Sequence, residues 1–165
     1  MQEITFHPIG VIHSPFAEPA GVPIQPIGAQ DFRGWIELLP EFEPGLNDLE
    51  AFSHLILLYY FHRVQGFALE VQPFLDNKPH GVFATRAPRR PNPIGLSIVR
   101  LERIEANTIY IQDVDVVDGT PLLDIKPYVP EFDTRQGAQT GWLAGKARQA
   151  SKQTADHRFS TPQDN

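Results

Sequence analysis

Two neighbouring segments are the best guide to the fold class: Leu96-Ser-Ile-Val-Arg-Leu-Glu-Arg-Ile104 and Thr108-Ile-Tyr-Ile-Gln-Asp-Val-Asp-Val-Val117. Both segments are short, and neither has the i, i+3, i+4 spacing of a long helix, so both are predicted to be β-strands. In the second segment the apolar residues change phase by one position between Ile111 and Val114, as they do at a β-bulge. Bulges often turn side chains toward a functional site, which makes the neighbouring acidic residues candidates for one.

The rest of the chain has the same character. Sixteen prolines and twelve glycines punctuate it, and few windows have helical spacing. We therefore expect an all-β protein of about eight short strands with minor helices, arranged as a barrel or a sandwich; a closed barrel would also protect the strand edges. The other predicted strands are Ile4–His13, Gly34–Leu39, His54–Phe61, Ala68–Phe74, Gly81–Ala84 and Leu122–Tyr128, and a short helix is predicted over Gly45–Phe52.

Length and composition limit what the chain can be. Its 165 residues fit one domain, and 41% hydrophobic residues can supply a core. The longest apolar run, Leu55–Phe61, is too short to cross a bilayer, and the N-terminus has no signal layout, so a cytoplasmic protein without membrane contact is expected. The absence of cysteine excludes disulfides, thiolate metal sites and a cysteine nucleophile.

The charge is unevenly distributed. A net charge of −6 argues against general binding of nucleic acid, which needs many cationic side chains near phosphates. However, the segment from Thr85 to Ile104 contains five arginines and one acidic residue. One local basic site on an acidic body suits a specific anionic ligand or a restricted RNA contact.

The most unusual segment is Gly81-Val-Phe-Ala-Thr-Arg-Ala-Pro-Arg-Arg-Pro-Asn-Pro-Ile-Gly95. Its prolines fix φ at their own positions and favour extended neighbours, so a stiff loop is predicted. Arginine offers a planar fork of donors for a carboxylate or phosphate, and ordering it in advance lowers the entropy lost on binding. The segment is therefore the candidate active site; the alternative is a rigid connection with solvated arginines.

The acidic segment 113–127 is the second candidate. Its carboxylates could bind a cation, ribose hydroxyls or a protonated amine, although Asp118-Gly-Thr-Pro121 is also ordinary turn chemistry. The spacing of the acids does not fit a calcium loop, and the histidines form no zinc motif, so no metal is expected. His62 beside Arg63 is either a ligand contact or a hydrogen-bonded structural residue. The chain has no Gly-x-Gly-x-x-Gly and no phosphate-binding loop, which argues against a doubly wound nucleotide-binding domain.

Two segments lie outside this strand pattern. Ser14–Asp31 is a long loop rich in Pro and Gly, and loops of this length in a compact domain are often functional. After Phe132 the chain becomes polar, with a weak helix expected over Gly137–Ala150 and disorder expected from Ser151 to Asn165. We therefore divide the chain into a barrel domain, 1–132, and a polar C-terminal extension, 133–165.

Several motifs stand out along the chain: Ile9-Gly-Val-Ile-His-Ser-Pro15, Gln25-Pro26, Leu49-Glu-Ala-Phe-Ser-His-Leu55, Gly81-Val-Phe-Ala-Thr-Arg86, Arg90-Pro-Asn-Pro-Ile-Gly95, Val117-Asp-Gly-Thr-Pro121 and Asp124-Ile-Lys-Pro127. Together they resemble the TsaA-like family, whose best known members are the TrmO tRNA methyltransferases. The resemblance covers roughly residues 4–132, and the run Gly81–Gly95 is its most specific part.

The resemblance implies a single-sheet closed β-barrel, a homodimer, and S-adenosylmethionine as the donor that methylates N6 of threonylcarbamoyladenosine beside the tRNA anticodon. Residues that match the family's cofactor contacts are Pro26, Ile27, Gly28, His62, Arg63, Arg86, Leu96, Gln112, Asp113, Val114 and Asp115. At Ile27, Arg63, Gln112 and Asp113 this chain departs from the residues usual in TrmO members, so backbone contacts carry over there more safely than side-chain contacts.

Roles can be assigned by chemistry. Methyl transfer from a sulfonium needs mainly orientation and a suitable field. Arg86 suits the methionine carboxylate, and Asp115 suits the amine or a ribose hydroxyl. An adenine N6 must lose a proton as the bond forms, and Asp118 or Asp124 are the candidate acceptors, with Lys126 orienting the nucleotide. The residues predicted to face tRNA phosphates are Arg89, Arg90 and Lys126.

One departure from the family keeps other functions open. Fuller TrmO proteins carry an additional C-terminal domain, whereas this chain has only about 33 residues after Phe132. The first alternative is a module that binds S-adenosylmethionine for sensing or regulation without methylating RNA. The second is a methyltransferase that acts on a small molecule or a protein.

Overall fold

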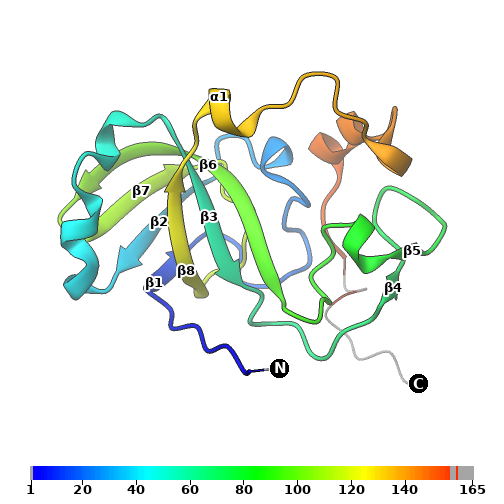
Figure 1. Ribbon diagram of the computed structural model, residues 1–165, viewed down its shortest axis with the longest axis horizontal. Coiled ribbons are helices and arrows are strands. Elements are labelled where there is room, and N and C mark those ends of the chain that lie inside the picture. Colours follow the sequence, from blue (N-terminus) through cyan, green and yellow to red (C-terminus); the bar gives the residue numbers. More distant parts are fainter. Residues whose placement is uncertain (1, 157–158, 160–165) are drawn as a thin grey trace.

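The computed structural model describes residues 2–156 and 159, and its centre is a closed antiparallel barrel (Figure 1). The six barrel strands follow one another around the barrel in the order β1-β2-β7-β6-β3-β8. Their bounds are β1 Gly10–His13, β2 Arg33–Leu38, β3 His54–Tyr60, β6 Ile94–Glu105, β7 Thr108–Gln112 and β8 Thr120–Pro127. Two further short strands, β4 (Glu70–Val71) and β5 (His80–Gly81), form a separate hairpin. The predicted closed β-barrel is thus confirmed, with six of the eight described strands in it.

Alternation of apolar and polar residues builds the core. In β2 every second residue is buried, and β1, β3 and β7 repeat the pattern. The inward side chains form one cluster inside the barrel, which includes Ile12, Ile36, Leu55, Leu57, Val99, Ile109, Ile111 and Leu122. Each such side chain contributes about 1.5–3 kcal/mol when it is removed from water, so the barrel is a rigid support for the loops at its ends.

The predicted bulge in the strand Thr108–Val117 was wrong, although the change of phase is real. Strand β7 ends at Gln112, and the next residue, Asp113, has a left-handed backbone with φ of 66°. This residue stops the strand and turns the chain, while Val114 still points into the core. Pairing between strands does shift register, but elsewhere: between Leu101 and Arg103 in β6 and between Leu58 and Tyr59 in β3.

Short helices occupy several connections. The helix predicted over Gly45–Phe52 appears as two 3-10 helices, η2 (Pro40–Leu46) and η3 (Leu49–Ala51), and a single α-helical turn, α1 (Pro130–Asp133), follows β8. The predicted strand Gly81–Ala84 is mostly another 3-10 helix, η4 (Val82–Ala84). Within the part of the chain that is described, no helix is long and apolar enough to cross a membrane.

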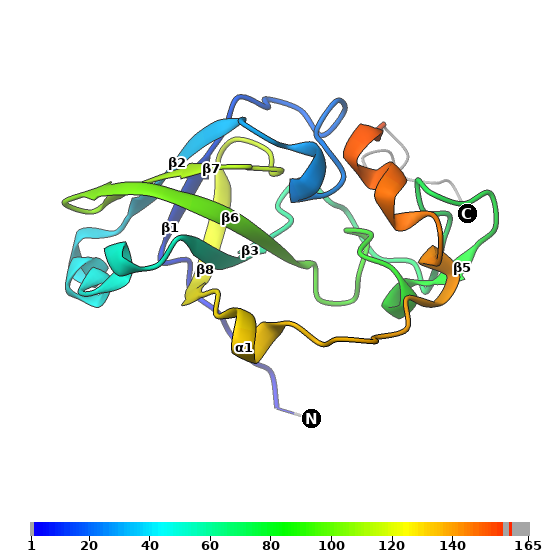
Figure 2. The same ribbon diagram turned by 90° about the horizontal axis from the view of Figure 1, so that it is seen from above.

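The C-terminal extension packs beside the barrel, against the long N-terminal loop and the β4–β5 hairpin. It contains the 3-10 helices η5 (Gly141–Leu143) and η6 (Ala147–Lys152), and both views place it next to the β4–β5 hairpin (Figures 1 and 2). Helix η6 contacts η1 (Pro26–Gly28) in the long N-terminal loop. Residues 153–155 pair with the loop backbone: Ile24 N donates to Gln153 O, and Ala155 N donates to Val22 O. The tail is therefore paired over these residues, and the remainder of its predicted disorder falls largely outside the described residues.

Candidate functional site

The Arg-bearing loop is held in shape by one of its own arginines. Arg90 Nη1 donates to the carbonyl oxygens of Val82, Thr85 and Ala87 at 3.1, 2.9 and 3.3 Å. The Thr85 hydroxyl adds a bond to Val82 O at 2.9 Å and accepts from Ala87 N at 3.2 Å. These contacts fix the backbone on both sides of Arg86. The hydrogen bonds from Arg90 are thus a constraint on this loop in addition to its prolines, and the sequence did not reveal them.

Arg86 joins two segments that lie far apart in the sequence. Its guanidinium Nη1 donates to Gln25 Oε1 at 2.8 Å, and Gln25 immediately precedes η1 of the long loop. Burial raises the pKa of the Asp115 carboxyl, and the positive charge of Arg86 interacts with that carboxyl and opposes the rise. The structure therefore brings together three of the predicted regions: the long loop, the Arg-bearing loop and the segment after β7.

A chain of buried hydroxyls ends at Asp115. Ser97 Oγ donates to Asp115 Oδ1 at 2.5 Å, and the Tyr59 hydroxyl lies 2.9 Å from Ser97 Oγ. Since the serine proton is directed at the carboxylate, Tyr59 is the donor to Ser97. Burial raises the pKa of the Asp115 carboxyl to about 7, while the bond from Ser97 and the charge of Arg86 oppose that rise.

Sequence reasoning missed Tyr59 and Ser97. The available signal was a serine at an inward position of an apolar strand, where Ser97 is 1% exposed. Gly95 belongs to the same arrangement because it lies directly opposite Tyr59 in the β3–β6 pair. A Cβ at Gly95 would come within 2.2 Å of a Tyr59 ring carbon, so glycine is what allows the ring to pack there.

Of the four residues from Gln112 to Asp115, Asp115 is the one whose side chain joins this chain of hydroxyls. Gln112 Nε2 donates to Glu102, and Val114 is part of the core. Asp113 Oδ1 accepts from Asp31 N at 3.1 Å and lies 3.3 Å from Arg100 Nη2. Asp113 thus anchors the end of the long loop to the barrel through its side chain.

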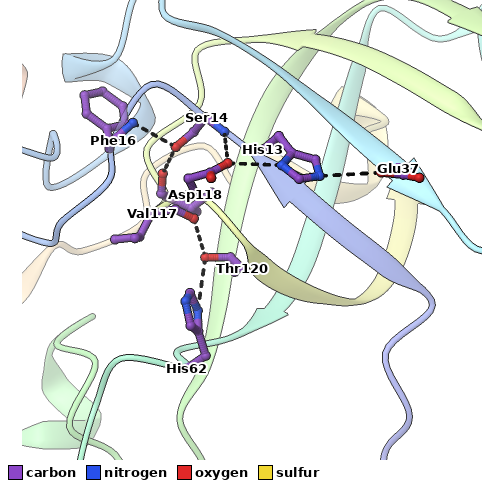
Figure 3. A network of polar contacts seen from close by, with 9 residues as sticks. His13, Ser14, Phe16, Glu37, His62, Val117, Asp118 and Thr120 are labelled. Atoms are coloured by element: carbon purple, nitrogen blue, oxygen red, sulfur yellow. Dashed lines mark hydrogen bonds and ion pairs between the residues drawn. The ribbon is translucent and has the colours of Figure 1, made fainter.

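His62 and Asp118 belong to a polar network at the β1 end of the barrel (Figure 3). His62 Nδ1 lies 3.5 Å from the Thr120 hydroxyl, and burial together with the Arg63 charge lowers the pKa of His62. Asp118 Oδ1 accepts from Ser14 N at 3.1 Å and lies 3.1 Å from His13 Nδ1. One carboxylate oxygen of Asp118 is thereby engaged in holding the end of β1.

Asp124 and Lys126 lie on the outer face of the barrel. The register shift in the β3–β8 pair places Asp124 opposite Leu58, whereas the core residue Tyr59 is opposite Leu122. Directly opposed residues in an antiparallel pair point to the same face, so Asp124 points outward with Leu58. Lys126 Nζ lies 2.7 Å from Asp124 Oδ2, which makes an exposed ion pair.

Leu96 shares that outer face, because it pairs with Leu58 from the other side. Leu96 is 46% exposed. Leu96, Leu58 and Asp124 therefore form a row across three neighbouring strands, which are about 4.8 Å apart. The predicted cofactor contact Leu96 and the predicted catalytic residue Asp124 are on one surface, while Asp118 lies in the turn before β8.

The remaining predicted contacts are peripheral to the hydroxyl chain. Pro26, Ile27 and Gly28 make up η1, in which Ile27 is 57% exposed. Arg63 is exposed, and Arg89 is partly buried, with its Nε making no hydrogen bond within the described residues. Nothing in the described part of the chain groups three or more His, Asp or Glu side chains in a way that could hold a metal ion.

Comparison with known proteins gives a consistent result. A family model described as the tRNA-methyltransferase O N-terminal domain matches residues 11–134. A Pyrococcus abyssi protein named a probable S-adenosyl-L-methionine-binding protein is 55% identical over 94% of this chain and 85% of its own length. A mouse tRNA (adenine(37)-N6)-methyltransferase is 40% identical over 78% of this chain.

The fold comparison agrees. The crystal structure of TrmO from Pseudomonas aeruginosa matches 86% of this chain with a TM-score of 0.71 and 44% identity. The match covers 63% of that structure's chain, and the match to the mouse protein covers only 32% of its length. The described chain is therefore similar to one part of these longer proteins.

Proposed function

The chain belongs to the family of the tRNA-methyltransferase O N-terminal domain, and on that basis we propose that it transfers a methyl group from S-adenosylmethionine to tRNA. The acceptor we propose is N6 of threonylcarbamoyladenosine beside the anticodon. The observation that supports a cofactor site is the hydrogen bond from Arg86 to Gln25, together with the electrostatic interaction between Arg86 and the carboxylate of Asp115.

The residues present fit the charges of the cofactor. The methionine part of S-adenosylmethionine carries a carboxylate and an ammonium group, and Arg86 and Asp115 offer one charge of each sign. The Arg86 guanidinium would bind the carboxylate, and Asp115 the amine or a ribose hydroxyl. When bound, S-adenosylmethionine supplies a methyl group already activated by its sulfonium.

The chain's own contribution is orientation and removal of a proton. Arg90 and Thr85 hold the Arg86 loop rigid, which limits the entropy lost on binding. Asp118 and Asp124 are both proposed as acceptors for the N6 proton: one oxygen of Asp118 is engaged by Ser14 and His13, while Asp124 accepts from Ile125 N and pairs with Lys126 on the outer face. Lys126 would orient the nucleotide.

Contacts to tRNA phosphates are proposed for Arg89, Arg90 and Lys126. Lys126 is exposed and suits the role, whereas one nitrogen of Arg90 is already committed to three carbonyls of its own loop. A homodimer, which the family resemblance implies, stays a proposal, as do a cytoplasmic location and the division into 1–132 and 133–165, which rest on the sequence pattern. The end of the family match at residue 134 supports that division.

The test is direct. The protein is incubated with labelled S-adenosylmethionine and total tRNA, and the digested nucleosides are separated. Label confined to methylated threonylcarbamoyladenosine supports the proposal. Tight binding without transfer to any tRNA would favour a binding module, the reading that the name of the Pyrococcus relative also permits.

A further inference from the structure

We propose that Trp142 in the C-terminal extension is a positioning residue for Arg86. Its indole holds the loop that carries the arginine, so the extension acts on the cofactor site through that loop. This inference rests on the proposed function of Arg86.

The contact of Trp142 with the loop is specific. Its Nε1 donates to Ala84 O at 2.7 Å, and Ala84 is the last residue of η4, two positions before Arg86. The indole also stacks on the ring of His80, with centroids 4.4 Å apart and 22° between the planes. Arg90 fixes the loop from one side, and Trp142 adds a second support through a different carbonyl.

Asp76 makes two further contacts, with residues near Trp142 in space or in sequence. Asp76 Oδ2 lies 2.7 Å from Lys146 Nζ and 3.2 Å from His80 Nε2. The hydrogen bond from Lys146 holds the pKa of Asp76 well below its usual range, so the aspartate is ionised at neutral pH. The extension is therefore attached to the β4–β5 hairpin at two points four residues apart, the ring stack of Trp142 and the ion pair of Lys146.

The same extension also supports the other partner of Arg86. A Cβ built on Gly28 would lie 3.1 Å from Ala150 O, so η1 and η6 are in close contact. Beyond η6, the backbone of residues 153–155 pairs with residues 21–24. The extension thus touches both segments whose side chains meet in the bond between Arg86 and Gln25.

Such support matters because a guanidinium binds a carboxylate through two bonds only in a narrow range of orientations. A displacement of about 1 Å in a supporting shell is enough to weaken a site strongly. If Trp142 served stability alone, the folded protein would keep its affinity for S-adenosylmethionine when the indole N–H is lost.

The experiment uses the full chain and the variants Trp142→Phe and Lys146→Ala. Phenylalanine keeps a ring against His80 but removes the donor to Ala84. Lys152→Ala is the matched control, since Lys152 is an exposed lysine of the same extension. Calorimetry with S-adenosylmethionine, thermal melting and amide hydrogen exchange over residues 82–90 are measured for each protein.

We expect Trp142→Phe to weaken S-adenosylmethionine binding roughly fivefold, the loss of about one hydrogen bond, and to speed exchange over residues 82–90. Lys146→Ala should act in the same direction and Lys152→Ala should change neither. Unchanged affinity for S-adenosylmethionine in both test variants would overturn the inference, whether or not exchange over residues 82–90 becomes faster. Failure of the wild-type chain to bind S-adenosylmethionine would instead refute the proposed function, and the exchange data would still report on the loop.

Discussion

Ser97 Oγ lies 2.5 Å from Asp115 Oδ1, so a serine of the barrel interior donates directly to the carboxylate beside Arg86. Ser97 comes from the long strand β6, and Asp115 follows the left-handed residue that ends β7. The bond therefore ties a loop residue to the most rigid part of the molecule. It also favours the ionised carboxylate against the effect of burial, which raises the pKa to about 7.

The raised pKa of Asp115 predicts how stability depends on pH. The folded protein holds the proton up to about pH 7, whereas the unfolded chain releases it near its ordinary pKa of 3.8. The contribution of Asp115 to the free energy of unfolding therefore decreases as pH rises from about 4 to 7, because the carboxyl ionises first in the unfolded chain. Asp115→Asn cannot ionise, so we expect its stability relative to wild type to increase over that range in urea unfolding. A difference between the two proteins that is independent of pH would contradict the assignment.

Because Gly95 lies close to the Tyr59 ring, adding a single methyl group at position 95 should lower the free energy of unfolding. In Gly95→Ala the Cβ would overlap Tyr59 ring atoms at 2.2, 2.5 and 2.8 Å, so the ring and its bond to Ser97 must move. We expect a loss of about 1–3 kcal/mol in the free energy of unfolding, measured with urea. Gly45→Ala is the control, because no atom lies within 4 Å of the added Cβ there. Equal stability of the two variants would show that the packing around Tyr59 is looser than described.

The two candidate proton acceptors differ in their surroundings, and substitution should separate them. Asp118→Ala removes the partner of Ser14 N and His13, so we expect its free energy of unfolding to fall by about 1 kcal/mol. Any loss of activity in this variant should therefore come with a loss of stability. Asp124→Asn alters an exposed side chain on the outer face, so it should leave the melting temperature nearly unchanged and lower the rate of tRNA methylation at least a hundredfold. Full activity in Asp124→Asn would remove Asp124 from the mechanism.

Much of the barrel could be predicted because alternation of apolar and polar residues is visible within each strand segment alone. Alternating burial in β2 and β3 follows directly from alternating residue types, and the predicted bounds of β3 and β8 differ from the observed ones by at most two residues. The predicted strand beginning at Ile4 is shorter in the structure, where β1 starts at Gly10. That difference reflects pairing, since a strand exists only where a neighbour accepts its hydrogen bonds.

The site could be predicted only in part, because its geometry depends on register and on long-range contacts. The outward direction of Asp124 follows from a shift in the β3–β8 pair that no periodicity reveals. The bond from Arg86 to Gln25 joins residues 61 positions apart, and the contact of Trp142 with Ala84 joins residues 58 positions apart. The proline-rich loop pointed to Arg86 as a candidate because proline restricts the backbone locally, and the role of Arg86 stays a prediction.

Calorimetric titration of S-adenosylmethionine into the wild-type chain and into Arg86→Ala shows whether Arg86 binds the cofactor. Because Arg86 is exposed, its charged hydrogen bonds should contribute about 1.5–3 kcal/mol, which is less than a fully desolvated contact would give. We predict that the wild-type chain binds and that Arg86→Ala binds roughly ten- to a hundredfold more weakly at an unchanged melting temperature. Equal affinity of the two proteins would contradict the account.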